Sequence, residues 1–476
     1  MATMKSTRIF ATLALTSGLT VAPALAQADA AGAVERVRQI TNEARVQGDR
    51  PSKFLDLAQQ EERQHNVGGW VTITGLDLRD DDHNAAKPDT LRTVLIQDYR
   101  LWAAGEMSKD ATYYVRGRKL AFEFDTLSGV PEPDFASQEK ATLDLAYVDW
   151  GFAPGFALRA GRQFTYVGRA LVLSADLDGA SVTYTHGSWQ HRVFGGVTVD
   201  RDPNLDTSIV GFAKETQDRD FYLTDTSYSF ESGTRVYGYA MVQQDHSRSL
   251  SAAQQARDFS YNTVHVGAGA EGSLGQLLHY YAEFVHQGGS MLADGPGTRV
   301  DIDANALLAG LLFYPETAWH PLASLELAHG SGDPARTSVT NTFGGKLTAT
   351  ADKNFMYFGT YDGGLALSPR LSDLTVLRAG YQVKPWPHEG HVLPGLLVGA
   401  KGSVYWKDET NGVISDPLAT LASRYVGSGV DAFIGWRPLS DFSLLGQYGR
   451  FIPGSAYALG ANDASNRVLL TSTLSF

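Results

Sequence analysis

The sequence contains no cysteine. Disulfide frameworks, thiolate nucleophiles and cysteine-ligated metal sites are therefore excluded, and an oxidising compartment presents no difficulty for the chain. Long apolar runs are also missing. The longest run, Ala304 to Tyr314, is broken by Asn305 and Gly310, and it falls short of the ~18 residues that a membrane-spanning helix needs. The sequence thus predicts no transmembrane helix.

Basic charge is scarce as well, because 52 acidic residues outnumber 40 lysines and arginines and give a net charge of -12. Nucleic-acid binding requires a concentrated basic surface, so nucleic acid is excluded as a partner. Gly267, Gly269 and Gly272 fit a G-x-G-x-x-G spacing without a βαβ unit around it. The pair His388 and His391 lacks the H-E-x-x-H spacing of a zinc helix. We therefore predict no cofactor and no metal.

Residues 1–26 have the three parts of a secretory signal peptide. Lys5 and Arg8 supply positive charge, an apolar run covers Ile9 to Ala22, and an A-x-A cleavage site ends at Ala26. The chain is therefore expected to be exported. An exported chain without a transmembrane helix is periplasmic, secreted or a membrane β-barrel.

Residues 27–66 differ from the rest of the chain. Val34, Val37 and Ile40 recur at helical spacing, and a similar group follows a break at 48–51. This periodicity predicts two short helices. The segment would be a periplasmic extension that packs below a barrel, or else a plug or a docking segment for a partner.

From Trp70 onward the dominant pattern is an alternation of apolar and polar residues with a period of two. Between Thr93 and Ala103, for example, Leu101 lies on one face while Asp98 and Arg100 lie on the other. Such segments recur with lengths near the ~9–11 residues of a tilted membrane strand, and we predict roughly eighteen of them. They are Trp70–Leu78, Thr93–Ala103, Thr112–Phe124, Thr142–Trp150, Phe156–Thr165, Ala180–Gly187, His191–Val199, Phe221–Phe230, Thr234–Gln243, Phe259–Ala270, Leu277–Gln287, Val300–Tyr314, Trp319–His329, Thr375–Lys384, Leu396–Trp406, Ser428–Arg437, Phe442–Phe451 and Arg467–Phe476.

The last of these strands ends the chain on an aromatic residue. Its alternate residues form an apolar face with Phe476, Leu474 and Leu470, and a mostly polar face with Thr473 and Thr471. Such a strand could be the edge of a soluble β-protein. It is also what a barrel needs to close against its first strand, with lipid on one side and water on the other. Phe476 would then be the residue that the barrel assembly machinery recognises.

The connections between the predicted strands alternate in length. Short ones, such as residues 153–155 and 438–441, predict periplasmic turns, and long polar ones predict extracellular loops. The predicted loops are residues 79–90, 201–208, 245–258, 287–299, 331–352 and 407–425. We therefore predict an all-β fold, a transmembrane antiparallel barrel of about 18 strands over residues 67–476. It would be inserted in the lipid of a Gram-negative outer membrane.

Charged residues within the strands can be assigned to a face. If the apolar face of every strand meets lipid, the strand cations and several strand acids point into the lumen. The predicted lumen cations are Arg100, Arg116, Arg118, Arg159, Arg378, Lys384, Lys401, Arg437 and Arg467. The predicted lumen acids are Asp98, Asp144, Glu283, Asp301, Asp303, Glu326 and Asp431. These groups would either brace the interior through salt bridges or set which ions and polymers pass.

Two stretches carry the motifs of a known family. In residues 147–169, a V-D-W strand end and a turn precede L-R-A-G-R-Q. Further on, G-S-G-D at 330–333, N-F at 354–355 and L-S-D-L at 371–374 follow one another. Both stretches resemble the outer-membrane alginate export channel family. The resemblance implies a monomeric barrel of about 18 strands through which an anionic polysaccharide passes.

The same resemblance implies an arginine-rich constriction that selects uronate polymers, and by position Arg159 and Arg162 match the family's pore arginines. Guanidinium groups can hold a carboxylate and pass it to the next site. One feature departs from the family pattern. Residues 337–364 contain Lys346 and Lys353 but no arginine, where the family has an arginine-rich loop.

We therefore predict a passive channel for the export of an anionic, alginate-like polysaccharide, with periplasmic proteins of an export complex as partners and no enzymatic activity. The alternative is a general or small-solute porin with the same fold. A further alternative is an outer-membrane barrel hydrolase, since such enzymes place Ser/His pairs at the outer rim. Its candidate residues would be His186, Ser188 and His191.

Overall fold

The computed structural model describes residues 65–80, 82–89, 91–126, 140–199, 218–246, 260–293, 297–386 and 393–476. The predicted signal peptide and almost all of the predicted helical extension lie outside the described residues. The first strand begins at His65, just before the predicted start of the barrel. No helix within the described ranges is long and apolar enough to cross a membrane.

Within the described residues, nineteen strands form a single sheet. The short β14 (Phe343–Lys346) belongs to a connection, and the other eighteen form a closed antiparallel barrel. The barrel strands are β1 (His65–Arg79), β2 (Leu91–Ser108), β3 (Ala111–Thr126), β4 (Thr142–Ala153), β5 (Phe156–Val167), β6 (Leu173–His186), β7 (Trp189–Thr198), β8 (Arg219–Ser229), β9 (Arg235–Asp245), β10 (Asn262–Leu274), β11 (Leu278–Ala293), β12 (Thr298–Phe313), β13 (Leu322–Gly330), β15 (Leu374–Val383), β16 (Leu397–Lys407), β17 (Tyr425–Leu439), β18 (Phe442–Pro453) and β19 (Ser465–Ser475). The prediction of an all-β barrel of about 18 strands is confirmed.

The barrel closes between β1 and β19, which pair antiparallel. At the end of this seam the Gly69 N–H donates to the Phe476 carbonyl (2.8 Å), and the Phe476 N–H donates to the Gly69 carbonyl (2.9 Å). Inside the barrel the hydroxyls of Thr72 and Thr473 lie 3.1 Å apart. The terminal residue is thus part of the seam, as the alternation of the last strand predicts.

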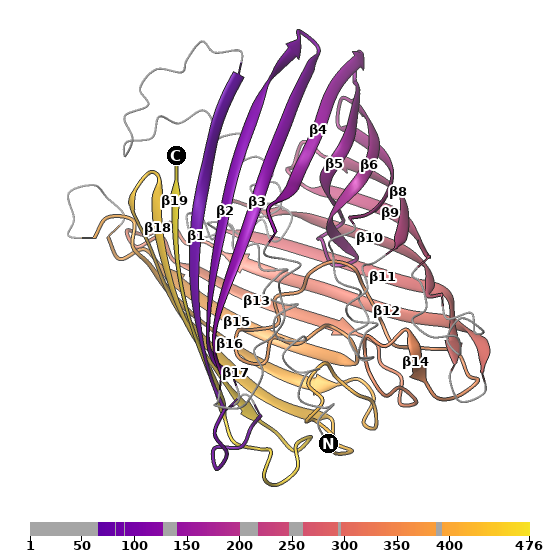
Figure 1. Ribbon diagram of the computed structural model, residues 1–476, viewed down its shortest axis with the longest axis vertical. Coiled ribbons are helices and arrows are strands. Elements are labelled where there is room, and N and C mark those ends of the chain that lie inside the picture. The colour runs from indigo at the N-terminus through magenta and orange to yellow at the C-terminus, as the bar shows by residue number, and fades with distance from the viewer. Residues whose placement is uncertain are drawn as a thin grey trace.

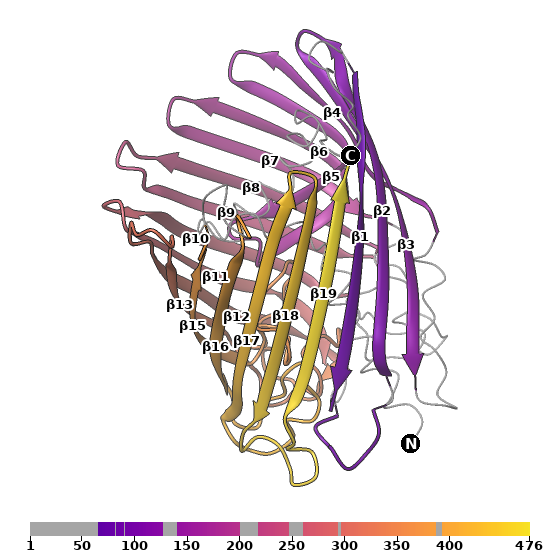
Figure 2. The ribbon, with the colours of Figure 1, turned by 90° about the vertical axis from the view of Figure 1, so that its left-hand side faces the viewer.

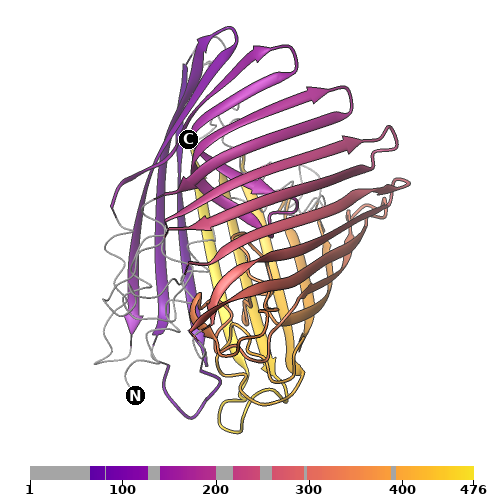
Figure 3. The same ribbon diagram turned by 90° about the vertical axis from the view of Figure 1, so that its right-hand side faces the viewer.

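Short turns gather at one end of the barrel, and longer connections lie at the other end (Figures 2 and 3). The turns between β2 and β3 and between β17 and β18 belong to the first group, and residues 331–373 and 408–424 belong to the second. One predicted loop, residues 287–299, is mostly strand, because β11 continues to Ala293 and β12 begins at Thr298. The outward side chains at this hairpin end are polar, which explains why its sequence is typical of a loop.

The outer face of the barrel carries large apolar side chains. Leu101 on β2, Val430 on β17 and Leu470 on β19 are 63%, 53% and 61% exposed. Their neighbours along the strands, such as Arg100 and Leu469, are buried on the inner face. An exposed apolar outer face with alternating inward residues is the arrangement of a membrane barrel.

β12 shows the reverse polarity along part of its length. Val300, Ile302 and Ala304 face inward and are buried, whereas Asp301 and Asp303 face outward. The prediction that these two aspartates point into the lumen is therefore wrong. The reason is that protein, rather than water, fills the interior beside this strand.

That filling is a large hydrophobic cluster inside the barrel next to β7–β13. Wall residues such as Phe221, Val285 and Ile302 pack in this cluster with Leu171 and Phe355. The last two belong to two segments that fold inward from the wall. Because these segments occupy one side of the lumen, any path for a solute must run beside them.

Candidate functional site

The first inward segment is the end of the β5–β6 hairpin, which leaves the wall and curves inside the barrel (Figure 1). β4 pairs with β5 only as far as Arg162, and β7 pairs with β6 only as far as Leu177. Beyond these points β5 and β6 pair with each other up to Val167 and Leu173. Gly161 lies at the bend with a φ of 122°, and a Cβ there would overlap the β4 backbone. Glycine is required because only it fits this backbone conformation.

The tip of this hairpin, residues 168–172, is anchored on Glu283 of β11. The buried carboxylate accepts hydrogen bonds from the Arg169 N–H (2.7 Å) and from the hydroxyls of Tyr237 (2.6 Å) and Tyr239 (2.8 Å). A buried carboxylate is stable only when such donors compensate for the lost hydration. The anchor therefore holds the tip against the filled wall.

The other side of the same hairpin approaches the β2–β4 wall. Phe164 packs against an aromatic cluster that includes Trp102, Tyr114 and Tyr147. Asp176 lies close enough to contribute to the electrostatic field at the Arg100 guanidinium. The hairpin thus reaches from β11 towards β2 and narrows the lumen between them.

The second inward segment is the connection from β13 to β15, residues 331–373. Its two ends are held together, because the Phe355 N–H donates to the Ser331 carbonyl (2.9 Å) and the Ser372 hydroxyl donates to the Phe355 carbonyl (2.6 Å). The motifs G-S-G-D, N-F and L-S-D-L therefore meet in space. They form the base of the inward connection, which is a structural role.

Two buried ion pairs stiffen this connection. The Lys346 ammonium lies 2.5 Å from the Asp333 carboxylate, and the Arg336 guanidinium lies 2.6 Å from that of Asp352. The second pair is fully buried. Removing one partner of such a pair leaves an uncompensated charge in the protein interior. The connection is therefore a folded part of the barrel.

Residues 355–360 carry the connection from the β10–β11 wall to the hairpin tip. The Met356 N–H donates to the Gln287 side chain (2.9 Å). Further along, the Phe358 N–H donates to the Val172 carbonyl (2.8 Å), and the Thr360 N–H donates to the Ala170 carbonyl (3.0 Å). The two inward segments are therefore joined by backbone hydrogen bonds.

Residues 361–365 then reach the opposite wall. The Leu365 N–H donates to the Asp431 carboxylate on β17 (3.1 Å), and Arg467 on β19 donates to the Leu365 carbonyl (3.2 Å). The Tyr405 hydroxyl on β16 donates to the Gly363 carbonyl (2.7 Å). The chain thus crosses the lumen from β10–β11 to β16–β19, and this crossing defines the constriction.

Charged side chains surround the constriction in ion pairs, first on β2–β4. Asp98 lies 2.9 Å from the guanidinium groups of both Arg100 and Arg118. Asp144 lies 2.5 Å from Arg116 and 3.6 Å from Arg100. Three guanidinium groups therefore share two carboxylates, with Arg100 in contact with both, and the interior is braced by salt bridges.

A second charged cluster lies where residues 361–365 meet β13–β16. The Asp362 carboxylate is 3.3 Å from Arg378 and 3.3 Å from Lys401. Glu326 is also 3.3 Å from Arg378. The side chain of Asp362 is 56% exposed, so solvent reaches the constriction here.

Three further ion pairs line the inner face closer to the short turns. They are Arg159 with Asp149 (2.7 Å), Arg192 with Asp225 (2.7 Å) and Arg235 with Glu271 (3.0 Å). Each side chain is about one-fifth exposed. Because every cation of this series has an acidic partner, the series presents both signs of charge to a passing solute.

The structure places most of the predicted lumen cations on the inner face, namely Arg100, Arg116, Arg118, Arg159, Arg378, Lys401 and Arg467. Arg162 is an exception. It pairs in register with Asp178 and Ala146 and binds the Asp178 carboxylate at 2.7 Å. Residues three apart on a strand lie on opposite faces, so Arg162 does not share the inner face with Arg159. Arg162 instead stabilises the bend of the hairpin.

Two other predicted cations lie at the short-turn end, outside the constriction. Lys384 follows β15, and its N–H donates to the Trp319 carbonyl (2.8 Å). The Arg437 guanidinium donates to the Ser440 carbonyl in the β17–β18 turn (3.1 Å). Both positions support turns.

Sequence reasoning missed several charged groups of the lumen. Arg192 and Arg235 lie on predicted strands, where the alternation already places them opposite the apolar neighbours, so this signal could have found them. Arg169 and Asp362 lie in connections without any periodicity. Nothing in the local sequence indicates that these connections fold inward.

The residues proposed for a hydrolase lie at the short-turn end. His186, Ser188 and His191 are exposed, and the His191 ring nitrogen lies 2.7 Å from the Thr226 hydroxyl. No group of three or more His, Asp or Glu side chains in the described parts of the chain could hold a metal ion.

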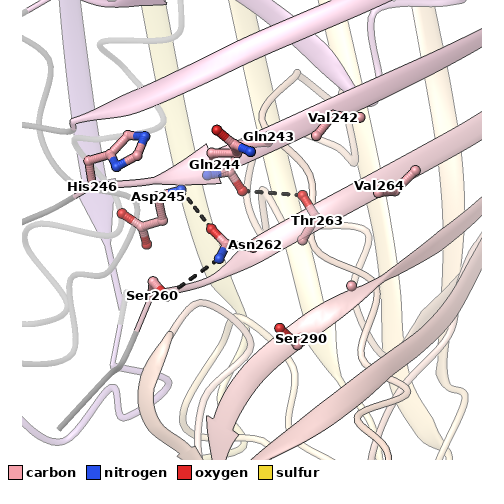
Figure 4. A pocket seen from close by; sticks show the side chains of 11 residues that line it. Val242, Gln243, Gln244, Asp245, His246, Ser260, Asn262, Thr263, Val264 and Ser290 are labelled. Atoms are coloured by element: carbon pink, nitrogen blue, oxygen red, sulfur yellow. Dashed lines mark hydrogen bonds between the residues drawn. The ribbon is translucent and has the colours of Figure 1, made fainter.

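A hollow of about 600 Å³ lies at the long-connection end of β9–β11 (Figure 4). Its polar lining is paired within the wall: the Asp245 N–H donates to Asn262 (2.8 Å), and the Thr263 hydroxyl donates to Gln243 (3.2 Å). None of the charged residues of the constriction lines it. The constriction is therefore the better candidate for a functional site.

A closed antiparallel barrel with an apolar outer face is the architecture of outer-membrane barrels, and comparison with solved structures agrees. OccK11 (OpdR) of Pseudomonas aeruginosa is similar at a TM-score of 0.52 and 13% identity, covering 87% of this chain and 96% of that one. OpdK of the same organism, solved with vanillate, gives a TM-score of 0.54 and 10% identity over 87% and 99%. OccK5 (OpdH) gives 0.53 and 11% over 87% and 98%. At these identities the likeness concerns the fold.

No family model matches the sequence, and no curated protein matches it. The structural neighbours named above are OccK and Opd proteins of Pseudomonas aeruginosa, one of them solved with vanillate, and not alginate export channels. The predicted membership of the alginate export family and the predicted export of an anionic polysaccharide are therefore wrong. The motifs behind that prediction are explained by the base of the inward connection and by the bend of the β5–β6 hairpin.

Proposed function

We propose that this chain is an outer-membrane channel through which small solutes pass passively. The observation that carries the proposal is that residues 355–365 cross the lumen and form a bridge between its two sides. In this bridge the Phe358 and Thr360 N–H groups donate hydrogen bonds to the hairpin tip. Such a bridge leaves only the space beside it open for solutes, and ion pairs border that space. The fold likeness to outer-membrane porins supports the same function.

We further propose that the short turns face the periplasm and that the long connections face the outside, the orientation usual for these barrels. The apolar outer face and the signal-like amino end support insertion into the outer membrane. The seam contacts of Phe476 support its recognition by the barrel assembly machinery. Removing Phe476 should lower the amount of inserted barrel, and unchanged insertion would contradict this role.

The lining supports small polar or charged solutes as the cargo. Guanidinium groups shared between carboxylates can exchange one partner for an anionic group of a solute and then release it. The paired carboxylates offer the same contact to cationic groups. One protein of similar fold was solved with vanillate, and we propose solutes of about that size for this chain.

The test uses the assembled full-length barrel in planar bilayers and in liposomes. We expect discrete conductance steps, and swelling of liposomes in small neutral sugars at rates that fall as the sugar grows. Added polyuronate should not block the current. Barrel that has been heat-denatured serves as the control. An assembled barrel that does not conduct, or a current blocked by polyuronate, would contradict the proposal.

A further inference from the structure

Asp362 is the most exposed of the ion-paired groups that the structure describes in the lumen, with 56% of its side chain exposed. The backbone next to it is held firmly on the wall. Tyr405 donates to the Gly363 carbonyl (2.7 Å), and the Leu365 N–H donates to Asp431 (3.1 Å). Gly364 has a φ of 115°, and a Cβ there would lie 2.5 Å from the Tyr405 hydroxyl. The carboxylate is therefore fixed in place although its connection is long.

The position of this carboxylate matters because of the two cations that it contacts. Arg378 and Lys401 each lie 3.3 Å from it and are 9% and 29% exposed. Arg378 is also held by Glu326 at 3.3 Å. Asp362 thus stands between two wall cations and the solvent of the lumen.

We propose that Asp362 determines the charge selectivity of the constriction by offsetting Arg378 and Lys401. This inference rests on the proposed function as a channel. With the carboxylate present, the constriction admits neutral and cationic solutes as well as anionic ones. Without it, two cations at contact distance from a passing ion attract anions and repel cations. Charges farther than about 10 Å from that path are screened at ordinary salt, so a group at the constriction dominates over groups at the mouths.

The test compares reversal potentials in a KCl gradient for the wild-type barrel and three variants. Asp362→Asn should raise the chloride-to-potassium permeability ratio by more than about fivefold, because one unit charge at contact distance in water changes the population of each ion by about that factor in opposite directions. Lys401→Gln should lower the ratio. The double variant should return it towards the wild-type value, because the two changes in charge cancel.

Asp225→Asn is the matched control. Asp225 is also an ion-paired aspartate of the inner face, 2.7 Å from Arg192 and 19% exposed, but its partner Arg192 donates to the Tyr166 carbonyl of the β5–β6 hairpin and not to residues 361–365. We expect a change of less than about twofold in the permeability ratio. An unchanged ratio in Asp362→Asn, or an equal shift in Asp225→Asn, would overturn the inference while the channel function stands. An assembled wild-type barrel without conductance would overturn the proposed function and the inference together.

Discussion

The inner faces of β2–β4 and of β12 are built from opposite kinds of residues. On β2–β4 the inner face carries Arg100, Arg116 and Asp144, which are buried in ion pairs. On β12 the inner face carries Val300 and Ile302, which pack against the inward connection. All four strands alternate with the same period. The difference lies in what each strand meets inside the barrel.

This comparison separates two ways of stabilising a barrel interior. A wall that faces charged neighbours is stable when each buried charge has a partner. A wall that faces a folded segment is stable when apolar surface is removed from water, which contributes about 25 cal/mol for each Å². The barrel uses the first on the side of β2–β4 and the second on the side of β7–β13. Exchanging the two kinds of residue should therefore be costly on either side.

The largest effect is expected for Asp144→Ala on the charged wall. The change removes the Asp144 carboxylate, which lies 2.5 Å from the Arg116 guanidinium and 3.6 Å from that of Arg100. Breaking a buried pair costs about 3–5 kcal/mol, and urea unfolding of the assembled barrel would measure it. Asp110→Ala removes a half-exposed carboxylate at a short turn and should cost no more than about 0.5 kcal/mol. Equal costs for the two variants would contradict the account of this wall.

The apolar wall is tested by Ile302→Ala on β12. Ile302 is 4% exposed, so the change opens a cavity and should lower the free energy of unfolding by about 2–4 kcal/mol. Leu311→Ala is the control on the same strand, because Leu311 is 45% exposed on the outer face and its loss leaves no cavity. A cost for Ile302→Ala no larger than that for Leu311→Ala would show that the interior beside β12 is not packed.

The two walls also show how much of the structure could be predicted from sequence. Alternation gives the strands and their number, and it correctly separates Leu101 from Arg100 on β2. Alternation does not say which face points inward. That assignment needs an assumption about polarity, and the assumption fails for Asp301 and Asp303 because a connection distant in sequence fills the lumen beside them.

The constriction was harder to predict than the barrel. Its ion pairs on β2–β4 follow from alternation, but Asp362 lies in a connection whose inward path depends on Val172, Gln287 and Asp431 in three other parts of the chain. Arg162 belongs to a motif of the resembled family, yet it lies three residues from Arg159 and therefore on the opposite face of β5. Such long-range contacts cannot be predicted from the local sequence. A motif shared between barrels can also have a role in folding and none in transport.

A smaller effect is expected where the hairpin meets the filled wall. Glu283→Ala removes the acceptor of Arg169, Tyr237 and Tyr239. The tip should detach, and the single-channel conductance should become larger and noisier because the hairpin moves in the lumen. Glu123→Ala, on the outer face of β3, is the control and should leave the current unchanged. A wild-type current in an assembled Glu283→Ala barrel would mean that the bridge through Phe358 alone fixes the hairpin.

Two aspartates at the long-connection end should make the stability of the barrel depend on pH. Asp416 is largely buried, which raises its pKa, but hydrogen bonds from His83 (2.9 Å) and Tyr457 (2.9 Å) outweigh burial and hold the pKa below the usual range. Its contribution to stability is present above the pKa of an unfolded aspartate and is lost on acidification. Burial raises the pKa of Asp373 to about 8, and the nearby Asp408 adds repulsion. The two groups should therefore respond to pH with opposite signs.

The last change, Asp373→Asn, is expected to alter how stability depends on pH. Because the folded-state pKa of Asp373 lies above the unfolded value of about 3.9, the contribution of this group is fully present below about pH 4 and is lost as the pH rises to about 8. Asparagine keeps an acceptor for the Glu409 N–H (2.7 Å) and tolerates the φ of 52° at this position. The variant should thus gain stability relative to wild type between pH 5 and pH 9, as measured by protease protection of residues 331–373. Asp416→Asn is the matched control, and its loss of stability should shrink on acidification. The same pH slope in wild type and Asp373→Asn would show that this carboxyl is ionised in the folded barrel.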